Sequence, residues 1–185
     1  MKKISGFTLI EMLSVLVIAV TLIAVAVPSF SDTVNRQKAN GEASDIISLL
    51  AVARSETIKR SKFVTLCSSI DSAECGGDWQ DGWILFVDED SNGVRGDDEL
   101  ILRGGQTGQK FILTYRAFGS SSYLRFAPFG LMLANNGTFK LCPEDGDARF
   151  ARAVIISKLA RTRLGRDRDG DGIAEDASGN PLGCF

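Results

Sequence analysis

The sequence has 185 residues, of which 44% are apolar, 21 are basic and 23 are acidic, so the formal net charge is −2 at pH 7. This length allows one domain of ordinary size beyond an N-terminal segment, and the near-neutral charge predicts no overall attraction to nucleic acid. Because the chain has no histidine, Ser-His-Asp catalysis, Cys-His catalysis and every histidine-ligated metal site are excluded.

The N-terminal segment joins a short basic leader to a long apolar run. Lys2 and Lys3 precede the run, so the positive-inside rule keeps the N-terminus cytoplasmic and sends the remaining chain outward. As a helix with a rise of roughly 1.5 Å per residue, residues 7–27 would extend about 31 Å, which is enough to span a bilayer. Glu11 is the one charged residue in this run, and a carboxylate at that depth needs a partner.

Two ordinary explanations of this segment compete. One is an uncleaved signal anchor, and the other is a secretory signal peptide that is cleaved after the small-x-small sequence Ala24-Val25-Ala26. Neither explains Glu11 or the Gly-Phe pair before the apolar run. The sequence Gly6-Phe7-Thr8-Leu9-Ile10-Glu11 resembles the N-terminal motif of type IV pilins and type II secretion pseudopilins, position for position.

This resemblance implies a specific maturation route. A prepilin peptidase would remove residues 1–6 by cutting between Gly6 and Phe7, and would methylate the new amine of Phe7. Residues 7–28 would then form the transmembrane and filament-core half of a long helix. In the filament, the Phe7 ammonium of one subunit would pair with the Glu11 carboxylate of its neighbour and set the stagger between subunits.

The helical pattern continues beyond the apolar run. Pro28 removes a backbone hydrogen bond and is expected to kink the helix. Apolar residues three or four apart predict an amphipathic second half over residues 29–60, whose covering face would carry Ile46, Ile47, Leu50 and Ala53. The alternative is two helices that are broken at Asn40-Gly41.

After residue 60 the pattern changes to short apolar runs separated by turn residues, which predicts a β-rich domain over residues 61–185. The fold class expected is α+β, with a long N-terminal helix packed on antiparallel sheets in the manner of type IV pilins. The predicted strands are Phe63–Cys67, Trp83–Val87, Glu99–Arg103, Phe111–Arg116, Tyr123–Ala127, Thr138–Cys142, Ala153–Ser157 and Arg161–Leu164.

The strand Trp83–Asp88 and the segment Glu99–Leu102 resemble the GspH/FimT group of minor pilins and pseudopilins. Members of this group carry an apolar strand, an acidic Asn-Gly loop and a return strand here, and they end in a short strand with the sequence Gly-Arg-x-Arg. The resemblance implies a low-abundance subunit near the filament tip. An enzyme is not expected, because no nucleophile with an activating base is recognisable.

The four cysteines form no Cys-x-x-Cys pair, so a zinc site is not expected. An even number of cysteines behind an export-type N-terminus favours two disulfides in an oxidising compartment. Of the three connectivities, we favour Cys67–Cys75, which closes a local loop, and Cys142–Cys184, which ties the tail to a strand. The alternative is four buried thiols.

Two acidic loops resemble calcium-binding loops in spacing. Asp88, Asp90, Asn92, Gly93 and Glu99 fit the EF-hand pattern D-x-[DN]-x-[DN]-G-x5-E without a mismatch. Flanking strands in place of helices, and an arginine at the usual apolar anchor, favour a solvated hairpin loop in which Asn92-Gly93 takes positive φ.

The second acidic loop matches the pattern only in part. Its carboxylates are Asp167, Asp169, Asp171 and Glu175, and Ser178 stands where a closing carboxylate belongs. We expect weak Ca²⁺ binding here before binding at the first loop, because a disulfide to Cys184 would hold the second loop closed. No other cofactor is expected.

Seven basic residues and one acid lie between Arg149 and Arg168, and four acids follow directly. Ala160-Arg161-Thr162-Arg163 resembles the group's Gly-Arg-x-Arg with Ala in place of Gly, whereas Gly165-Arg166-Asp167-Arg168 has the spelling but falls later. Arg161, Arg163, Arg166 and Arg168 are therefore candidate contacts for DNA phosphates. The alternative, which we favour, is that they pair with the acidic tail or with another pilin.

Taken together, the sequence predicts a minor pilin that helps to prime assembly of a type IV pilus or lies near its tip. It would be a single-pass inner-membrane protein with a periplasmic globular domain, would be processed by prepilin peptidase and would enter a pilus with other minor and major pilins. The alternatives are a DNA-binding minor pilin for transformation and a pseudopilin of type II secretion.

Overall fold

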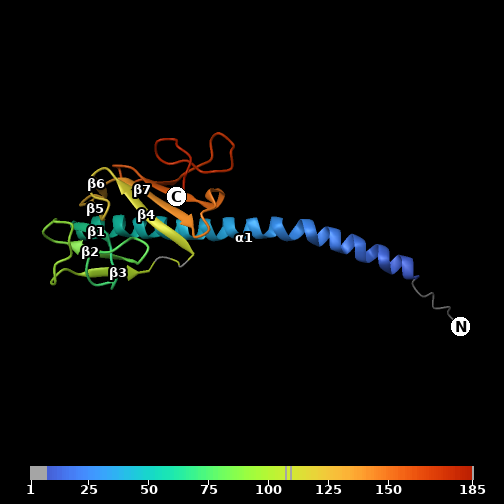
Figure 1. The fold of residues 1–185 in the computed structure, drawn as a ribbon. Helices are drawn as coiled ribbons and strands as arrows, with labels where there is room; N and C mark the ends of the chain where they lie inside the picture. The colour runs from blue at the N-terminus through green and yellow to red at the C-terminus, as the bar shows by residue number, and fades with distance from the viewer. Residues whose placement is uncertain (1–7, 107, 109, 185) are drawn as a thin grey trace. The chain divides into compact units, whose positions relative to one another are not determined.

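The computed structural model describes residues 8–106, 108 and 110–184. These residues form two compact units, one within residues 1–38 and one within residues 39–185. The long helix α1 (Leu9–Arg60) contributes its first part to one unit and its last part to the other (Figure 1). The predicted helix end near Arg60 is therefore confirmed, and the alternative of two helices broken at Asn40-Gly41 is wrong.

The first unit is the N-terminal part of α1. Helical residues flank position 28 on both sides, so the helix does not end there, and the kink predicted at Pro28 stays a prediction. In the part of the chain that is described, no helix has both the length and the apolar character needed to cross a membrane. The transmembrane role expected for residues 7–28 stays a prediction.

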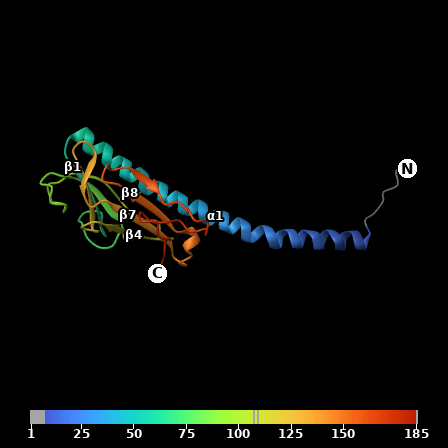
Figure 2. The ribbon, with the colours of Figure 1, turned by 90° about the horizontal axis from the view of Figure 1, so that it is seen from above.

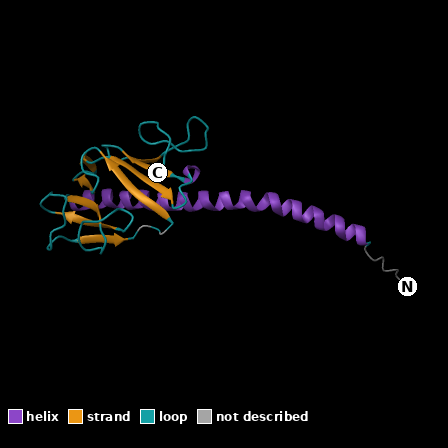
Figure 3. Cartoon of the chain, in the orientation of Figure 1, coloured by secondary structure: helices purple, strands orange, loops and turns teal. Residues whose placement is uncertain are grey.

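The second unit contains all the β-strands as well as the end of α1 (Figure 3). A short 3-10 helix, Ala148–Phe150, is capped by Asp147. The strands are β1 (Phe63–Ser68), β2 (Trp83–Asp88), β3 (Ile101–Gly105), β4 (Phe111–Ala117), β5 (Tyr123–Ala127), β6 (Leu131–Ala134), β7 (Gly137–Pro143), β8 (Arg152–Ile156) and β9 (Thr162–Leu164).

These strands form two antiparallel sheets, with the strand orders β3-β2-β1-β5-β6 and β4-β7-β8-β9. Strand β1 pairs with β2 on one side and with β5 on the other, so it lies at the centre of the first sheet. The eight predicted strands are present with small shifts at their ends. Strand β6, which directly follows the turn at Phe129-Gly130, was not predicted from the sequence.

The C-terminal part of α1 covers both sheets in the second unit (Figure 2). The predicted face is correct at Ile46, Leu50 and Ala53, which are at most 9% exposed, and the main core also takes Ala39 and Leu49 from the helix. An aromatic cluster lies in this core, where the Phe139 ring is 5.0 Å from the Trp79 ring and 4.4 Å from the Tyr115 ring. The α+β pilin-like architecture expected from the sequence is thus present.

The structure contains both disulfides that the sequence favoured. Cys67–Cys75 closes the loop after β1, and Cys142–Cys184 joins β7 to the C-terminal tail. The tail is also held by packing, because Leu182 is 5% exposed and belongs to a second buried cluster with Ala151 and Ala153. The alternative of four free thiols is therefore wrong.

Candidate functional site

Glu11, in the first turn of helix α1, exchanges hydrogen bonds with Thr8. Its Oε2 atom accepts hydrogen bonds from the Thr8 backbone N–H (3.1 Å) and from the Thr8 hydroxyl (3.2 Å), while the Glu11 N–H donates to Thr8 Oγ1 (3.3 Å). This arrangement is a capping box, which satisfies N–H groups that the first helical turn leaves open. The predicted processing site, Gly6 and Phe7, lies outside the described residues.

The first turns of α1, on both sides of Glu11, expose apolar side chains in every direction. A helix that is apolar all round is normally buried in a core or a membrane, so this surface needs a cover from outside the chain. The exposed fractions range from 56% to 81% for Leu9, Ile10, Met12, Leu13, Val15, Leu16, Val17, Ile18, Val20, Leu22 and Ile23.

The arginines near strand β9 are exposed, but not all of them line one groove. A groove is lined by Asn40, Arg152, Arg163, Leu164, Gly165, Arg166, Asp167 and Arg168, and Arg161 is not among its lining residues. Among the described residues, Arg168 is the one predicted phosphate contact with an ion pair, which it makes to Glu175 (3.6 Å). Pairing with the acidic tail is thus seen for Arg168 alone.

The turn between β8 and β9 indicates which segment corresponds to Gly-Arg-x-Arg. Ala160 has a φ of +53°, a left-handed conformation that favours glycine. The backbone at this position is therefore of the kind that the glycine of the motif would adopt. Gly165 is required for a different reason, since a Cβ there would lie 2.4 Å from the carbonyl oxygen of Glu175. The Ala160–Arg163 segment is therefore the better structural counterpart of the motif.

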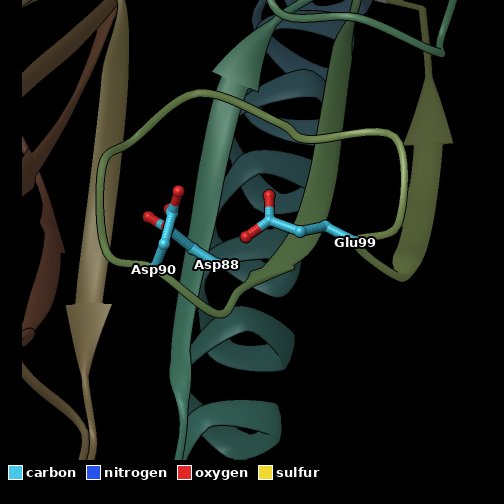
Figure 4. Close-up of side chains that lie close together, drawn as sticks. All are labelled: Asp88, Asp90 and Glu99. Atoms are coloured by element: carbon cyan, nitrogen blue, oxygen red, sulfur yellow. The ribbon is translucent and has the colours of Figure 1, made fainter.

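The first acidic loop connects β2 to β3, and its two end carboxylates are buried (Figure 4). Asp88 is 0% exposed, and its Oδ2 accepts hydrogen bonds from the Thr65 hydroxyl (2.7 Å) and the Gly93 N–H (3.1 Å). Burial raises the pKa of the Asp88 carboxyl, although these hydrogen bonds oppose the shift. The expectation of a solvated loop is wrong for Asp88 and for Glu99, which is 8% exposed.

The loop backbone also differs in detail from the expected Asn92-Gly93 turn. Positive φ values occur at Ser91 (+61°) and Gly93 (+81°). The Glu99 carboxylate accepts the N–H groups of Glu89 (2.6 Å) and Gly96 (2.9 Å), so it closes the loop from the side opposite Asp88. One carboxylate oxygen from each of Asp88, Asp90 and Glu99 lies within 4.8 Å of the others.

The second acidic loop repeats part of this arrangement. Asp167 accepts hydrogen bonds from the N–H groups of Gly170 (2.7 Å) and Gly172 (2.9 Å), and these bonds lower the pKa of the Asp167 carboxyl. Glu175 Oε1 accepts the Arg168 N–H (2.8 Å), so Glu175 closes the loop at the place where the sequence pattern pointed to Ser178.

The structure groups Asp167, Asp169 and Glu175 as a possible ligand set and leaves out Asp171, which the sequence had included. Asp171 instead accepts the N–H of Ile173 (2.7 Å). Calcium binding by this loop stays a prediction.

Two residues near the first loop were not predicted as part of any site. Thr65, in the buried strand β1, donates its hydroxyl to Asp88, and Arg125, in β5, lies 3.9 Å from the same carboxylate. A charged residue inside the apolar strand Tyr123–Ala127 was the one available sequence signal, since a partly buried arginine favours a carboxylate partner.

Comparisons with known proteins agree with this architecture. Residues 42–160 match the family described as type II transport protein GspH, and residues 1–27 match the prokaryotic N-terminal methylation motif. No curated protein matches the sequence. Two crystal forms of the type IV minor pilin FimU from Pseudomonas aeruginosa are similar in structure. The P21 form has 21% identity, a TM-score of 0.56, and coverage of 81% of this chain and 97% of that one. The P65 form has 21% identity and a TM-score of 0.52, and the match covers 79% of this chain and 99% of the FimU chain.

Proposed function

Because this chain belongs to the type II transport protein GspH family, whose members are structural pilin-like subunits, we propose that it helps to prime assembly of a type IV pilus as a minor pilin. The observation that carries this proposal is the methylation motif over residues 1–27, whose helical part exposes apolar side chains on all sides. An assembly subunit supplies the missing cover for that helix from its neighbours.

Maturation would convert the N-terminus into one half of an assembly contact. We propose that prepilin peptidase cuts between Gly6 and Phe7 at the inner membrane and methylates Phe7. The subunit would be held at the membrane by its N-terminal segment, with the second unit in the periplasm, until it enters the filament. There, the Phe7 ammonium of one subunit would pair with the Glu11 carboxylate of its neighbour.

The capping box provides a way to separate two roles of Glu11. Glu11→Gln keeps a side-chain oxygen that can cap Thr8 but removes the charge, whereas Thr8→Ala removes the cap and keeps the charge. We expect Glu11→Gln to fold and yet to incorporate poorly into filaments, and Thr8→Ala to incorporate normally. The measurement is the fraction of each variant in sheared filaments relative to the total cell content. Normal incorporation of Glu11→Gln would contradict the assembly role.

Type II secretion is the second assembly that this family serves, and the two can be separated by genetics. Deletion of the gene should reduce surface pili and leave protein secretion intact if the pilus is the correct assembly. Loss of secretion with normal pili would make the chain a pseudopilin.

DNA uptake is a further candidate, favoured by one observation, the groove that Arg152, Arg163, Arg166 and Arg168 line. Weak binding without sequence preference would follow from phosphate contacts, and four contacts predict a log–log salt slope of roughly −3.6 on duplex DNA. Arg163→Gln with Arg166→Gln should weaken binding, and Lys158→Gln, an exposed charge outside the groove, is the matched control. Equal binding by both variants would remove this candidate.

A further inference from the structure

The loop between β2 and β3 contains a buried carboxylate oxygen that has no hydrogen-bond partner. The two oxygens of Asp88 are used unequally, because Oδ2 accepts bonds from Thr65 and Gly93 while Oδ1 is buried and, among the described residues, has no hydrogen-bond partner. A buried polar atom without a hydrogen bond costs free energy, so it needs an explanation such as a bound ion.

The charge around this atom favours a cation. Asp88, Asp90 and Glu99 bring three carboxylates together at the loop, with one oxygen of each within 4.8 Å of the other two. In Figure 4 the three side chains lie inside the ring of the loop, with Glu99 directed toward Asp88 and Asp90. Like charges at this separation repel unless a cation lies between them.

The positive side chain that pairs with Asp88 does not occupy the place of a metal ion. The Arg125 Nη1 atom lies 3.9 Å from Asp88 Oδ2 and donates to the carbonyl oxygen of Ser91. This guanidinium pairs with Oδ2, the Asp88 oxygen that already accepts hydrogen bonds, so Oδ1 is left without a hydrogen-bond partner among the described residues. Arg95 is a second positive charge at the loop and donates to the carbonyl oxygen of Glu99 (3.4 Å). Residues 88–99 carry six acidic side chains, so the loop stays negative with both arginines counted.

We propose that the loop of Asp88, Asp90 and Glu99 binds a calcium ion. The donor groups are all oxygens, which suits Ca²⁺ and disfavours zinc and copper. The residues occupy the first, third and twelfth positions of the EF-hand spacing, and Gly93, at the sixth position, has the positive φ that the sharp turn requires. Calcium accepts irregular geometry in an exposed loop, whereas Mg²⁺ demands a near-ideal octahedron.

The second acidic loop is an internal comparison for this site. Its closing carboxylate, Glu175, also has a buried oxygen without a hydrogen-bond partner, but that Oε2 atom lies 3.6 Å from the Arg168 guanidinium. A cation there would have to displace Arg168, whereas the guanidinium near Asp88 lies 3.9 Å from the other oxygen of that carboxylate, Oδ2. The first loop is therefore the tighter site, in reverse of the order expected from the sequence.

Tyr123 gives this proposal a local reporter. A Cβ on Gly93 would lie 2.7 Å from two atoms of the Tyr123 ring, so the ring packs directly against the loop. Terbium(III) replaces calcium at oxygen sites, and a terbium ion bound at this loop would be excited by energy transfer from the Tyr123 ring. The segment 165–184 contains no tyrosine or tryptophan, so its loop offers no reporter of its own.

The experiment uses the full-length chain in detergent micelles, stripped of metal by a chelator. We expect tyrosine-sensitised terbium emission that calcium displaces, with a calcium Kd of about 10⁻⁴–10⁻³ M, the range of extracellular modules. Asp90→Asn, an exposed substitution that should not disturb folding, is expected to weaken calcium binding at least about tenfold in calorimetry. Asp169→Asn is the matched control in the second loop and should leave this affinity unchanged.

Tyr123→Phe tests the assignment of the signal. We expect this variant to lose the sensitised emission and to keep the calcium binding measured by calorimetry. The proposal is overturned if millimolar calcium produces no binding heat, if Asp90→Asn binds as tightly as the parent chain, or if only Asp169→Asn loses binding.

Discussion

Removal of the Cys142–Cys184 disulfide should destabilise the second unit more than removal of Cys67–Cys75. The first disulfide joins residues 42 positions apart, and the second joins residues 8 apart. A cross-link stabilises by restricting the unfolded chain, and the restriction grows with the length of the loop that it closes. The two pairs therefore form a matched test of the same mechanism.

The expected magnitudes follow from the chain-entropy relation for these separations. They are about 4 kcal/mol for the long loop and about 2.5 kcal/mol for the short one. In each pair one sulfur is almost fully buried, since Cys142 and Cys67 are both 1% exposed. Substitution by alanine therefore removes similar packing from both sites, and the difference of about 1.5 kcal/mol isolates the loop term.

The assay is equilibrium unfolding of residues 31–185 in guanidinium chloride, followed by fluorescence of the buried Trp79. The parent fragment, Cys67→Ala with Cys75→Ala, and Cys142→Ala with Cys184→Ala are compared by their extrapolated free energies of unfolding. Equal destabilisation of the two variants, or a larger effect at the short loop, would refute the argument. The tail packing around Leu182 would then hold the C-terminus without the disulfide.

Three further predictions concern stability. Gly165→Ala should lower the free energy of unfolding by about 1–3 kcal/mol, because the new Cβ would meet the backbone of Glu175. Gly41→Ala, at a helical position with open space around it, should raise the free energy of unfolding by about 0.5–1 kcal/mol. Denaturant titration of both variants measures these changes. Phe139→Ala should cost about 3–5 kcal/mol, because it removes a fully buried ring from the aromatic cluster, and thermal melting measures the loss. The N–H groups of Glu74 and Ala73 lower the pKa of Asp71. The ionised Asp71 carboxylate therefore stabilises the fold above its unfolded pKa, and this stabilisation is lost as the pH falls through its folded pKa. We expect Asp71→Asn to lower the free energy of unfolding at pH 7 and to change it little in acid. Unfolding titrations across that pH range measure the difference.

Local patterns were sufficient to predict most of the secondary structure. The periodicity of α1 and the short apolar runs after it depend on neighbours in the chain, so the helix end near Arg60 and eight strands could be predicted. Strand β6 was missed, because its apolar residues follow a turn in which Phe129, a non-glycine residue, takes a φ of +79°. The disulfide pairing could be favoured from spacing and from the expected position of the tail.

The properties of the candidate sites depend on contacts between distant residues. The spacing of Asp88 and Glu99 was visible in the sequence, but the loop was expected to be solvated. Nothing local showed that Asp88 would meet Thr65 of β1 and Arg125 of β5, or that Glu99 would be buried. In the same way, Arg152 reaches Asn40, 112 residues away, and joins the basic groove, whereas Arg161 does not.

By itself, the sequence determined the N-terminal motif, the long helix, the α+β class and the types of residue that can bind ions, because these depend on covalent order and local periodicity. Only the tertiary structure decided which carboxylates are buried, which oxygen of Asp88 is left without a partner, and that Glu175 closes the second loop in place of Ser178. The burial and the hydrogen-bond partners of these carboxylates are set by contacts between segments far apart in the chain, so they cannot be predicted from local sequence.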